Sequence, residues 1–405
     1  MLGAAEAVPA GADGRVRLPW SLSFPLGAML ALSFFVMREP APSDLLFPVV
    51  VGATVLGGHM VSPFRFPFPV VATALAVIAI NLAGLLWSRS PIDAARYGAI
   101  TIYMVFLALL LAGVVGKYGM RGARLVTTSY GIAALIAAGI GLGARFDLVP
   151  NSHLFFRGED GLRIKSTFKD PNVFSPFMVG AVMLWLSQLV GAKRIRLTTV
   201  AALGIGVAAV LLAFSRGAWA HLMLSTALYA GMHVALIRDP ASIGRLVRAA
   251  GLGALALIPG VAVLLAQPEL LDYFSERLSL QSYDSQRFGN QSVAWTLATE
   301  HPLGMGPGMW EQIPGVIATH NVYARVLTEN GLAGLFAYLG FCGAFLLAGL
   351  RVVLRRGPAA NLAAACMAVT LGALGESFII DTLHWRHFFL FLGVPLGLWL
   401  AEKER

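Results

Sequence analysis

The sequence carries little charge. Only 13% of its 405 residues are Asp, Glu, Lys or Arg, whereas 57% are hydrophobic and the mean hydropathy is +0.74. Soluble domains are about 45–50% apolar, so this composition excludes a soluble enzyme. It predicts an all-α integral membrane protein, because a helix satisfies its backbone hydrogen bonds without water.

Cysteine, internal repeats and acidic pairs are also scarce or missing. The two cysteines, Cys342 and Cys366, lie inside apolar runs, which excludes a disulfide framework and a cysteine zinc site. The sequence has no Asp-x-Asp pair and no repeat that would indicate an inverted-repeat transporter. No signal-peptide pattern opens the chain, so we expect the first apolar run, near Leu18, to remain as a span.

Twelve apolar segments are candidate membrane spans, since about 20 apolar residues cross the hydrocarbon core. They cover residues 18–37, 44–61, 68–87, 95–116, 124–144, 172–190, 197–214, 217–237, 247–267, 331–350, 361–380 and 387–402. The second segment is rich in glycine and the last one is short. The sequence therefore predicts one polytopic membrane domain, residues 1–405, with about 12 transmembrane helices.

The distribution of Lys and Arg predicts the orientation of these spans. With the N-terminus in the cytoplasm, seventeen of the 30 basic residues lie in cytoplasmic segments and only five in short outer loops, as the positive-inside rule requires. Both termini are then cytoplasmic, and two long loops, 145–171 and 268–330, face outward. The net charge of +9 follows from this topology, so it does not indicate nucleic-acid binding.

One polar interruption, FSRGAWAH, divides the apolar run 197–237 and forces a tight outer turn at Arg216. An arginine that anchors a helix end at the membrane surface explains the residue on its own. The alternative is an anion ligand. A helix starts directly after Arg216, so its free N–H groups and the guanidinium would face the same phosphate or diphosphate.

The first long loop ends in three basic residues and a helix start. Asp170 and Pro171 are typical of the N-cap and first position of a helix. Arg163, Lys165 and Lys169 precede them, either as a solvated run of charge or as groups that steer an anionic head group.

The second long loop holds the stretch from Arg287 to Gly331, which concentrates Arg, His and Glu in a chain that is otherwise apolar. Irregular backbone between spans must lie in water or in a cavity lined by protein, so we predict that this loop is the catalytic one. Arg287 precedes a predicted short helix, 291–300. The glycines of HPLGMGPGMW permit a tight turn, with or without a ligand.

His320 lies at or just before a predicted helix that ends at Gly331, with Thr319 or Asn321 as its cap. The helix field there disfavours an imidazolium, and a neutral imidazole is what a general base needs. A surface histidine is the plainer interpretation. The rival bases are Glu300, Glu311 and Glu329, and His301 precedes a proline and is interpreted as structural.

A last outer turn, DTLHWRHFF, contains Asp381, His384, Arg386 and His387. The two histidines and the aspartate could bind a metal. We favour an interfacial belt of Trp, Arg and His instead.

The order FKDPNVF, SRGAW, HPLGMGPGMW and THNVYARVLTENGLAGL, over roughly residues 165–340, resembles the O-antigen ligase and O-antigen polymerase superfamily. The resemblance implies a GT-C-like bacterial inner-membrane enzyme, an inverting glycosyltransferase without metal or cofactor. It implies transfer of a glycan from undecaprenyl diphosphate to a sugar hydroxyl in the periplasm. Its catalytic residues carry over to Arg216, Arg287 and His320, and the expected substrate contacts are Lys165, Lys169, Arg163, Asn321 and Arg325. The family's Asn-Pro step departs here to Asp170-Pro171-Asn172, so no role is transferred to it.

Ligase and polymerase share these motifs and differ in the acceptor, which is lipid A-core in one and a second lipid-linked glycan in the other. We expect the ligase, with the polymerase as the alternative. A transporter of lipid-linked glycans would need ionisable residues inside several spans. Here the charges cluster at the ends of the spans and in the outer loops, with Glu376 and Glu329 as exceptions.

Overall fold

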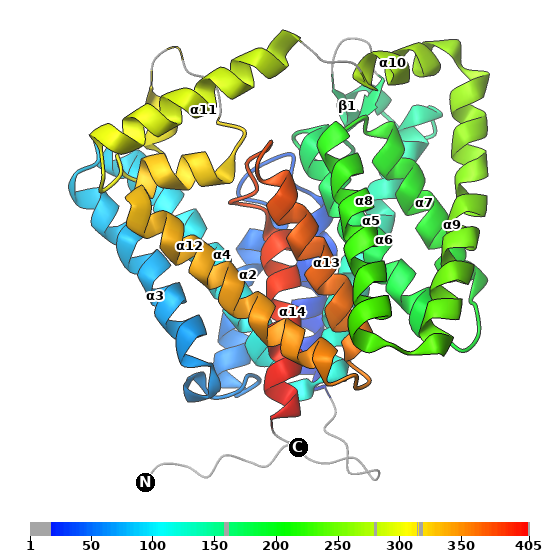
Figure 1. The fold of residues 1–405 in the computed structure, drawn as a ribbon, viewed down its shortest axis with the longest axis horizontal. Helices are drawn as coiled ribbons and strands as arrows, with labels where there is room; N and C mark the ends of the chain where they lie inside the picture. Colours follow the sequence, from blue (N-terminus) through cyan, green and yellow to red (C-terminus); the bar gives the residue numbers. More distant parts are fainter. Residues whose placement is uncertain (1–17, 158–161, 279–281, 314, 316–318, 404–405) are drawn as a thin grey trace.

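The computed structural model describes residues 18–157, 162–278, 282–313, 315 and 319–403, and nearly all of them are helical (Figure 1). Among these residues the only sheet is a short antiparallel pair in the first long loop, β1 (Phe156–Arg157) and β2 (Arg163–Ile164). The predicted all-α class is therefore confirmed.

Each of the twelve predicted apolar segments overlaps a helix. These helices are α1 (Trp20–Ala31), α2 (Pro42–Leu56), α3 (Phe68–Ala83), α4 (Pro91–Tyr118), α5 (Met120–Arg145), α6 (Pro171–Gly191), α7 (Leu197–Leu212), α8 (Arg216–Met232), α9 (Pro240–Ala266), α12 (Val322–Leu354), α13 (Ala360–Glu376) and α14 (Arg386–Glu402). Among the described residues, six helices are long and apolar enough to cross a membrane, and several others are shorter and apolar. The protein is thus a multi-pass membrane protein, and twelve crossings stay a prediction.

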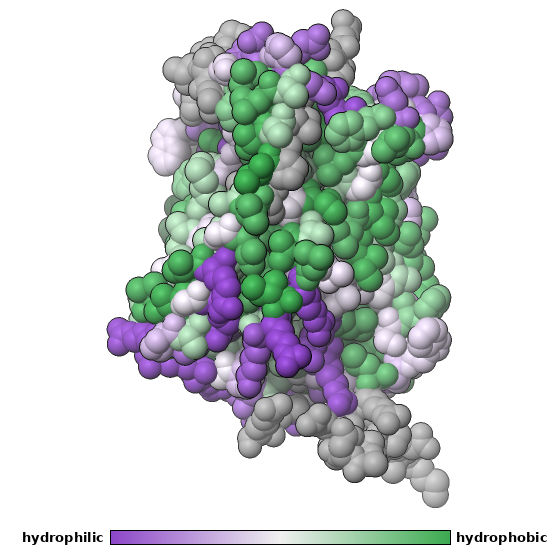
Figure 2. Space-filling model, turned by 90° about the vertical axis from the view of Figure 1, so that its right-hand side faces the viewer, coloured by the Kyte–Doolittle hydropathy of each residue, from purple (hydrophilic) through white to green (hydrophobic). Residues whose placement is uncertain are grey.

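The second long loop contains further helices, α10 (Pro268–Leu278) and α11 (Ser282–Glu300). The helix predicted at 291–300 is therefore real but begins nine residues earlier. Figure 1 places α10, α11 and β1 at one end of the molecule, called here the loop end, and the C-terminal end of α14 at the other. In Figure 2 a hydrophobic band separates hydrophilic groups at the two ends, as expected for a protein in a bilayer.

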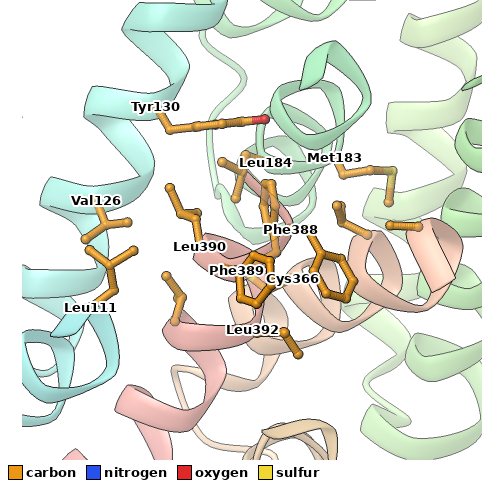
Figure 3. Close-up of a cluster of buried hydrophobic side chains, with 14 of the residues drawn as sticks. Leu111, Val126, Tyr130, Met183, Leu184, Cys366, Phe388, Phe389, Leu390 and Leu392 are labelled. Atoms are coloured by element: carbon orange, nitrogen blue, oxygen red, sulfur yellow. The ribbon is translucent and has the colours of Figure 1, made fainter. Parts of the chain in front are cut away.

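Helix α14 lies at the centre of the bundle and packs against α4, α12 and α13. A side chain at Gly393 or Gly397 would come within 2.7 Å of carbonyl oxygens of α4, so these glycines allow the two backbones to approach closely. Phe388, Phe389 and Leu390 fill the neighbouring space between helices (Figure 3). Both cysteines are free and buried in this core.

Candidate active site

Helix α12 consists of two segments that meet at Gly331, where φ is 67° and ψ is −174°. The first segment, 322–330, lies at the loop end, and the second runs across the bundle to the opposite end (Figure 1). The helix predicted to end at Gly331 is thus present, and a new helix starts directly after it. Glycine adopts this backbone conformation at little cost, whereas other residues are strained in it.

The glycine turn, residues 302–310, covers the end of this first segment. The N–H groups of Met305 and Gly306 donate to the carbonyls of Thr328 and Glu329, both at 2.9 Å. A helix leaves its last carbonyls without partners, and here the turn supplies them. A side chain at Gly304 would collide with the Glu329 carbonyl. The turn therefore has a structural role that needs no ligand.

The same turn is held to the α3–α4 connection. The indole N–H of Trp87 donates to the Gly304 carbonyl at 2.9 Å, and a side chain at Gly308 would collide with the ring of Tyr97. Contacts between residues more than 200 positions apart in the sequence thus fix where the first segment of α12 lies.

Arg325 is 5% exposed and lies among three carboxylates. Its guanidinium is 3.2 Å from Glu329 and 3.4 Å from Glu311, and it donates a hydrogen bond to Asp381. It also lies 5.0 Å from the centre of the Tyr97 ring. These contacts make Arg325 a residue that positions α12, and its predicted contact with substrate stays a prediction. Two of the three alternative candidates for the general base, Glu311 and Glu329, thus form ion pairs with Arg325.

The charge of Arg325 shifts the pKa values of two residues in the loop between α13 and α14, Asp381 and His384. Burial alone would raise the pKa of Asp381, but Arg325 and His384 hold it below its usual range. Burial and the charge of Arg325 lower the pKa of His384 to about 4. Its Nε2 lies 3.0 Å from the hydroxyl of Thr101 in α4.

The start of α12 is bound to the end of α13. Asn321 is the N-cap, with its side-chain oxygen accepting from the N–H of Ala324 at 3.0 Å, which decides between the two predicted caps. The N–H of Val322 donates to the Ser377 carbonyl at 2.9 Å. His320 therefore lies directly before a helix N-terminus, as predicted. It is half-buried, with φ at 47°, a conformation that non-glycine residues adopt mainly at functional sites or turns.

The start of α8 is bound to the same end of α13. Arg216 is the first residue of α8, which thus begins one residue earlier than predicted, and Ser215 caps the helix. Gly217 faces Glu376, the last residue of α13, and a side chain there would approach Oε1 of Glu376 to 2.9 Å. Glu376 Oε2 lies 2.8 Å from Nδ1 of His221, one turn further along α8.

The pair of His221 and Glu376 is completely buried, with side-chain exposures of 0% and 1%. Nε2 of His221 lies 3.0 Å from the Val369 carbonyl, so this nitrogen carries a hydrogen. One further proton is then shared between Nδ1 and Oε2, and the pair is neutral wherever that proton resides. Reasoning from the sequence missed this pair as a link between helices, although a Glu and a His inside apolar runs were its signal.

Helix α11 contacts the same end of α13. The side-chain amide of Gln291 donates to the Phe378 carbonyl, directly after α13, at 3.3 Å. Arg287 lies in α11 four residues before Gln291, and its side chain lies outside the described residues. The segments that carry Arg216, His320 and Arg287 thus all contact residues 376–378, although they are far apart in sequence.

The predicted residues of the first long loop divide into two groups. Arg163 donates to the Ala213 carbonyl at 3.4 Å and to Asn172 at 3.1 Å, which places it beside the α7–α8 turn that leads to Arg216. Lys169 instead forms an ion pair with Glu39 at 2.7 Å, and Lys165 is half-buried. Asp170 caps α6, as predicted.

The start of α14 is held by an ion pair with α2. Arg386 donates two hydrogen bonds, at 2.6 and 2.5 Å, to the carboxylate of Asp44. In the part of the chain that the structure describes, no group of three His, Cys, Asp or Glu is arranged to hold a metal ion.

A comparison with known protein families matches a stretch of the chain that includes segments at the loop end. Residues 200–339 match the family model described as O-antigen ligase. No curated protein matches the chain. The matched stretch includes α8, α11, the glycine turn and the first segment of α12, and it confirms the resemblance seen in the motifs. It ends before α13, the helix that these segments share as a contact.

Proposed function

We propose that this chain, whose residues 200–339 match the O-antigen ligase family, is an inverting glycosyltransferase that works without a metal ion. Its donor is a glycan on undecaprenyl diphosphate, and its acceptor is a sugar hydroxyl of lipid A-core. The reaction takes place on the periplasmic side of the bacterial inner membrane, with both termini in the cytoplasm.

One observation supports the proposal most. The N-terminal ends of α8 and α12 contact neighbouring residues, Glu376 and Ser377, at one end of α13. Each helix N-terminus carries a partial positive charge, which favours a phosphate. Arg216 and His320 stand at these two N-termini. A diphosphate and a reacting hydroxyl could therefore meet between them.

The proposed reaction is a single displacement at the anomeric carbon of the donor sugar. The acceptor oxygen forms a bond to this carbon as the bond to the diphosphate oxygen breaks on the opposite face, which inverts the configuration. His320 takes the proton of the acceptor hydroxyl. Undecaprenyl diphosphate leaves with the electron pair of the broken bond.

The leaving diphosphate gains negative charge as the bond breaks. Arg216 and Arg287 are proposed to stabilise that charge through charge-assisted hydrogen bonds, for which the planar guanidinium is better suited than an ammonium. Arg163, beside the α7–α8 turn, is proposed to assist in holding the donor. Lys165 and Lys169 are proposed to attract the anionic head group of the membrane-bound donor.

The proposal is tested with the purified full-length protein, a donor on undecaprenyl diphosphate and lipid A-core as acceptor. His320→Ala should lower the transfer rate by about 10²–10⁴, the usual effect of removing a positioned base. His153→Ala, an exposed histidine of the first long loop, is the matched control and should change the rate little. Transfer by His320→Ala within a few-fold of the unmodified protein would overturn the assignment of the base.

A second arm of the experiment replaces lipid A-core with a lipid-diphosphate glycan. Transfer to lipid A-core alone supports a ligase, whereas chain extension of the lipid-linked glycan indicates the polymerase. Loss of transfer on addition of EDTA would contradict the metal-free mechanism.

A further inference from the structure

Two basic side chains contact one indole ring at the end of the bundle opposite the loop end. Arg351 lies in the last turn of α12, and Lys403 directly follows α14. The guanidinium carbon of Arg351 is 5.9 Å from the centre of the Trp399 ring, and Nζ of Lys403 is 4.1 Å from it. Trp399 is only 3% exposed, so a ring that the core holds in place brings the two cations together.

The positive charge of these two residues is largely unmatched. Glu402, next to Lys403, pairs instead with Arg355 at 2.9 Å. No carboxylate of the described chain forms an ion pair with Arg351 or Lys403. Both cations offset the partial negative charge at a helix C-terminus, but that charge is only about half a unit per helix. Positive charge therefore remains for an anion to match.

The face of α12 that carries Arg351 is otherwise apolar and exposed. Leu347, Arg351 and Leu354 are spaced by four and three residues, so they share one side of the helix. Leu347 is 57% exposed and Leu354 52%, and the same stripe continues through Gly343 and Leu339 towards the loop end. An exposed apolar stripe on a membrane helix is a surface for lipid chains. Arg351 thus lies where this surface meets a cluster of positive charge.

We propose that this end of the bundle binds an anionic phospholipid, with its phosphate between Arg351 and Lys403 and an acyl chain along the exposed stripe of α12. Both cations donate charge-assisted hydrogen bonds to the phosphate oxygens. Basic groups beside membrane helices bind anionic head groups in this way. A zwitterionic head group adds a cation of its own to the two already present and is disfavoured. A soluble anion has no chain to cover Leu347 and Leu354.

The proposal is tested by native mass spectrometry of the full-length protein after its own lipids have been exchanged for detergent. The probe is dioleoylphosphatidylglycerol, and dioleoylphosphatidylcholine has the same chains with a zwitterionic head group. We expect saturable binding of phosphatidylglycerol and weaker binding of phosphatidylcholine. Arg351→Gln or Lys403→Gln should each weaken the affinity for the first phosphatidylglycerol molecule roughly fivefold, and the double variant roughly 25-fold.

The matched control is the double change Lys193→Gln and Arg194→Gln. It also removes one lysine and one arginine, from the exposed connection between α6 and α7, whose neighbour Gly191 lies beside Asn361 at the start of α13. This control should leave the affinity unchanged. If it weakens binding as much as the double change at Arg351 and Lys403, the overall positive charge attracts the lipid and the proposed site is wrong. Melting temperatures show that the variants are folded, and the single changes serve if a double variant is not.

Inorganic phosphate tests whether the acyl chain is needed. Compared with sodium chloride at the same ionic strength, it should not displace phosphatidylglycerol. Displacement by phosphate, equal binding of phosphatidylcholine, or unchanged binding by the double variant at Arg351 and Lys403 would each overturn the proposal. The readout is lipid binding and not glycan transfer, and both cations lie outside residues 200–339, so failure leaves the proposed function untouched.

Discussion

At the scale of single residues, Arg325 and Glu376 are ionisable side chains in buried positions. Arg325 compensates Glu329, which is 3% exposed, together with the less buried Glu311 and Asp381. Removing one partner of a buried ion pair leaves the other uncompensated, which is far more costly than losing a pair at the surface.

Arg325→Met should therefore lower the free energy of unfolding by about 3–5 kcal/mol. Arg355→Met is the matched control. Its ion pair with Glu402 is 2.9 Å long, with Arg355 47% exposed, and such surface pairs contribute about 0–1 kcal/mol. Thermal unfolding of the two purified variants measures the difference. Equal destabilisation would show that the cluster around Arg325 does not depend on its charge.

Glu376 tests how α8 is positioned. Glu376→Gln keeps the shape, and its amide can donate to Nδ1 of His221, so transfer activity should stay within a few-fold of the unmodified protein. Glu376→Ala leaves the buried Nδ1 without a partner and opens space beside Gly217. We expect it to lower both stability and kcat.

A different result is expected if Glu376 only stabilises the protein and does not position α8. In that case Glu376→Ala would lose thermal stability but keep kcat and KM when assayed well below its melting temperature. A change in KM for the lipid-linked donor, with the same KM for the acceptor, would support placement of Arg216 through Glu376.

At the scale of elements, the glycine turn 302–310 and the first segment of α12 form one unit. Gly331 adopts φ of 67°, and a side chain there would collide with the Pro302 carbonyl. Gly304 approaches the same junction from the other side. This reciprocal contact explains why the motif HPLG and the motif ENG occur together in the sequence.

Gly331→Ala should therefore destabilise the protein by at least about 1–3 kcal/mol, the cost of holding a non-glycine residue in this conformation. Gly343→Ala, in the second segment of the same helix with open space around it, should be neutral or stabilise by about 0.4–1 kcal/mol. Melting temperatures of both variants check the prediction. A Gly331→Ala variant as stable as Gly343→Ala would refute the proposed junction.

At the scale of the whole molecule, the loop between α13 and α14 connects much of the bundle. Asp381 bonds Arg325 of α12, His384 contacts Thr101 of α4, and Arg386 bonds Asp44 of α2. The stability of the bundle should then respond to the protonation of this loop.

Stability should fall as the pH decreases from about 6.5 to 4. The pKa of His384 is about 4 in the folded protein and 6.5 in the unfolded chain, so between these values the unfolded chain binds the extra proton and is favoured. The pKa of Asp381 is also lowered in the folded protein, so its carboxylate contributes stability that is lost as the pH falls further. Melting temperature measured against pH should decline over this window, and His384→Gln should flatten the decline. An unchanged slope in that variant would contradict the prediction.

The sequence by itself determined the membrane class, the positions of the twelve apolar segments and the cap at Asp170, and it limited the cap of α12 to Thr319 or Asn321. These features depend on local composition and on neighbouring residues, which a single chain displays directly. The locations of Arg216 and His320 at helix starts followed from the same local rules.

Only the tertiary structure decided which helix ends meet. Residues 376–378 of α13 and the turn after it contact α8, α11 and α12, and no local pattern in the sequence indicated that α13 would be their common neighbour. Likewise, Arg325 was predicted as a substrate contact and proved to lie among three carboxylates from distant segments. Pairings of this kind depend on the packing of glycines and buried polar groups between helices, which is a property of the assembled bundle.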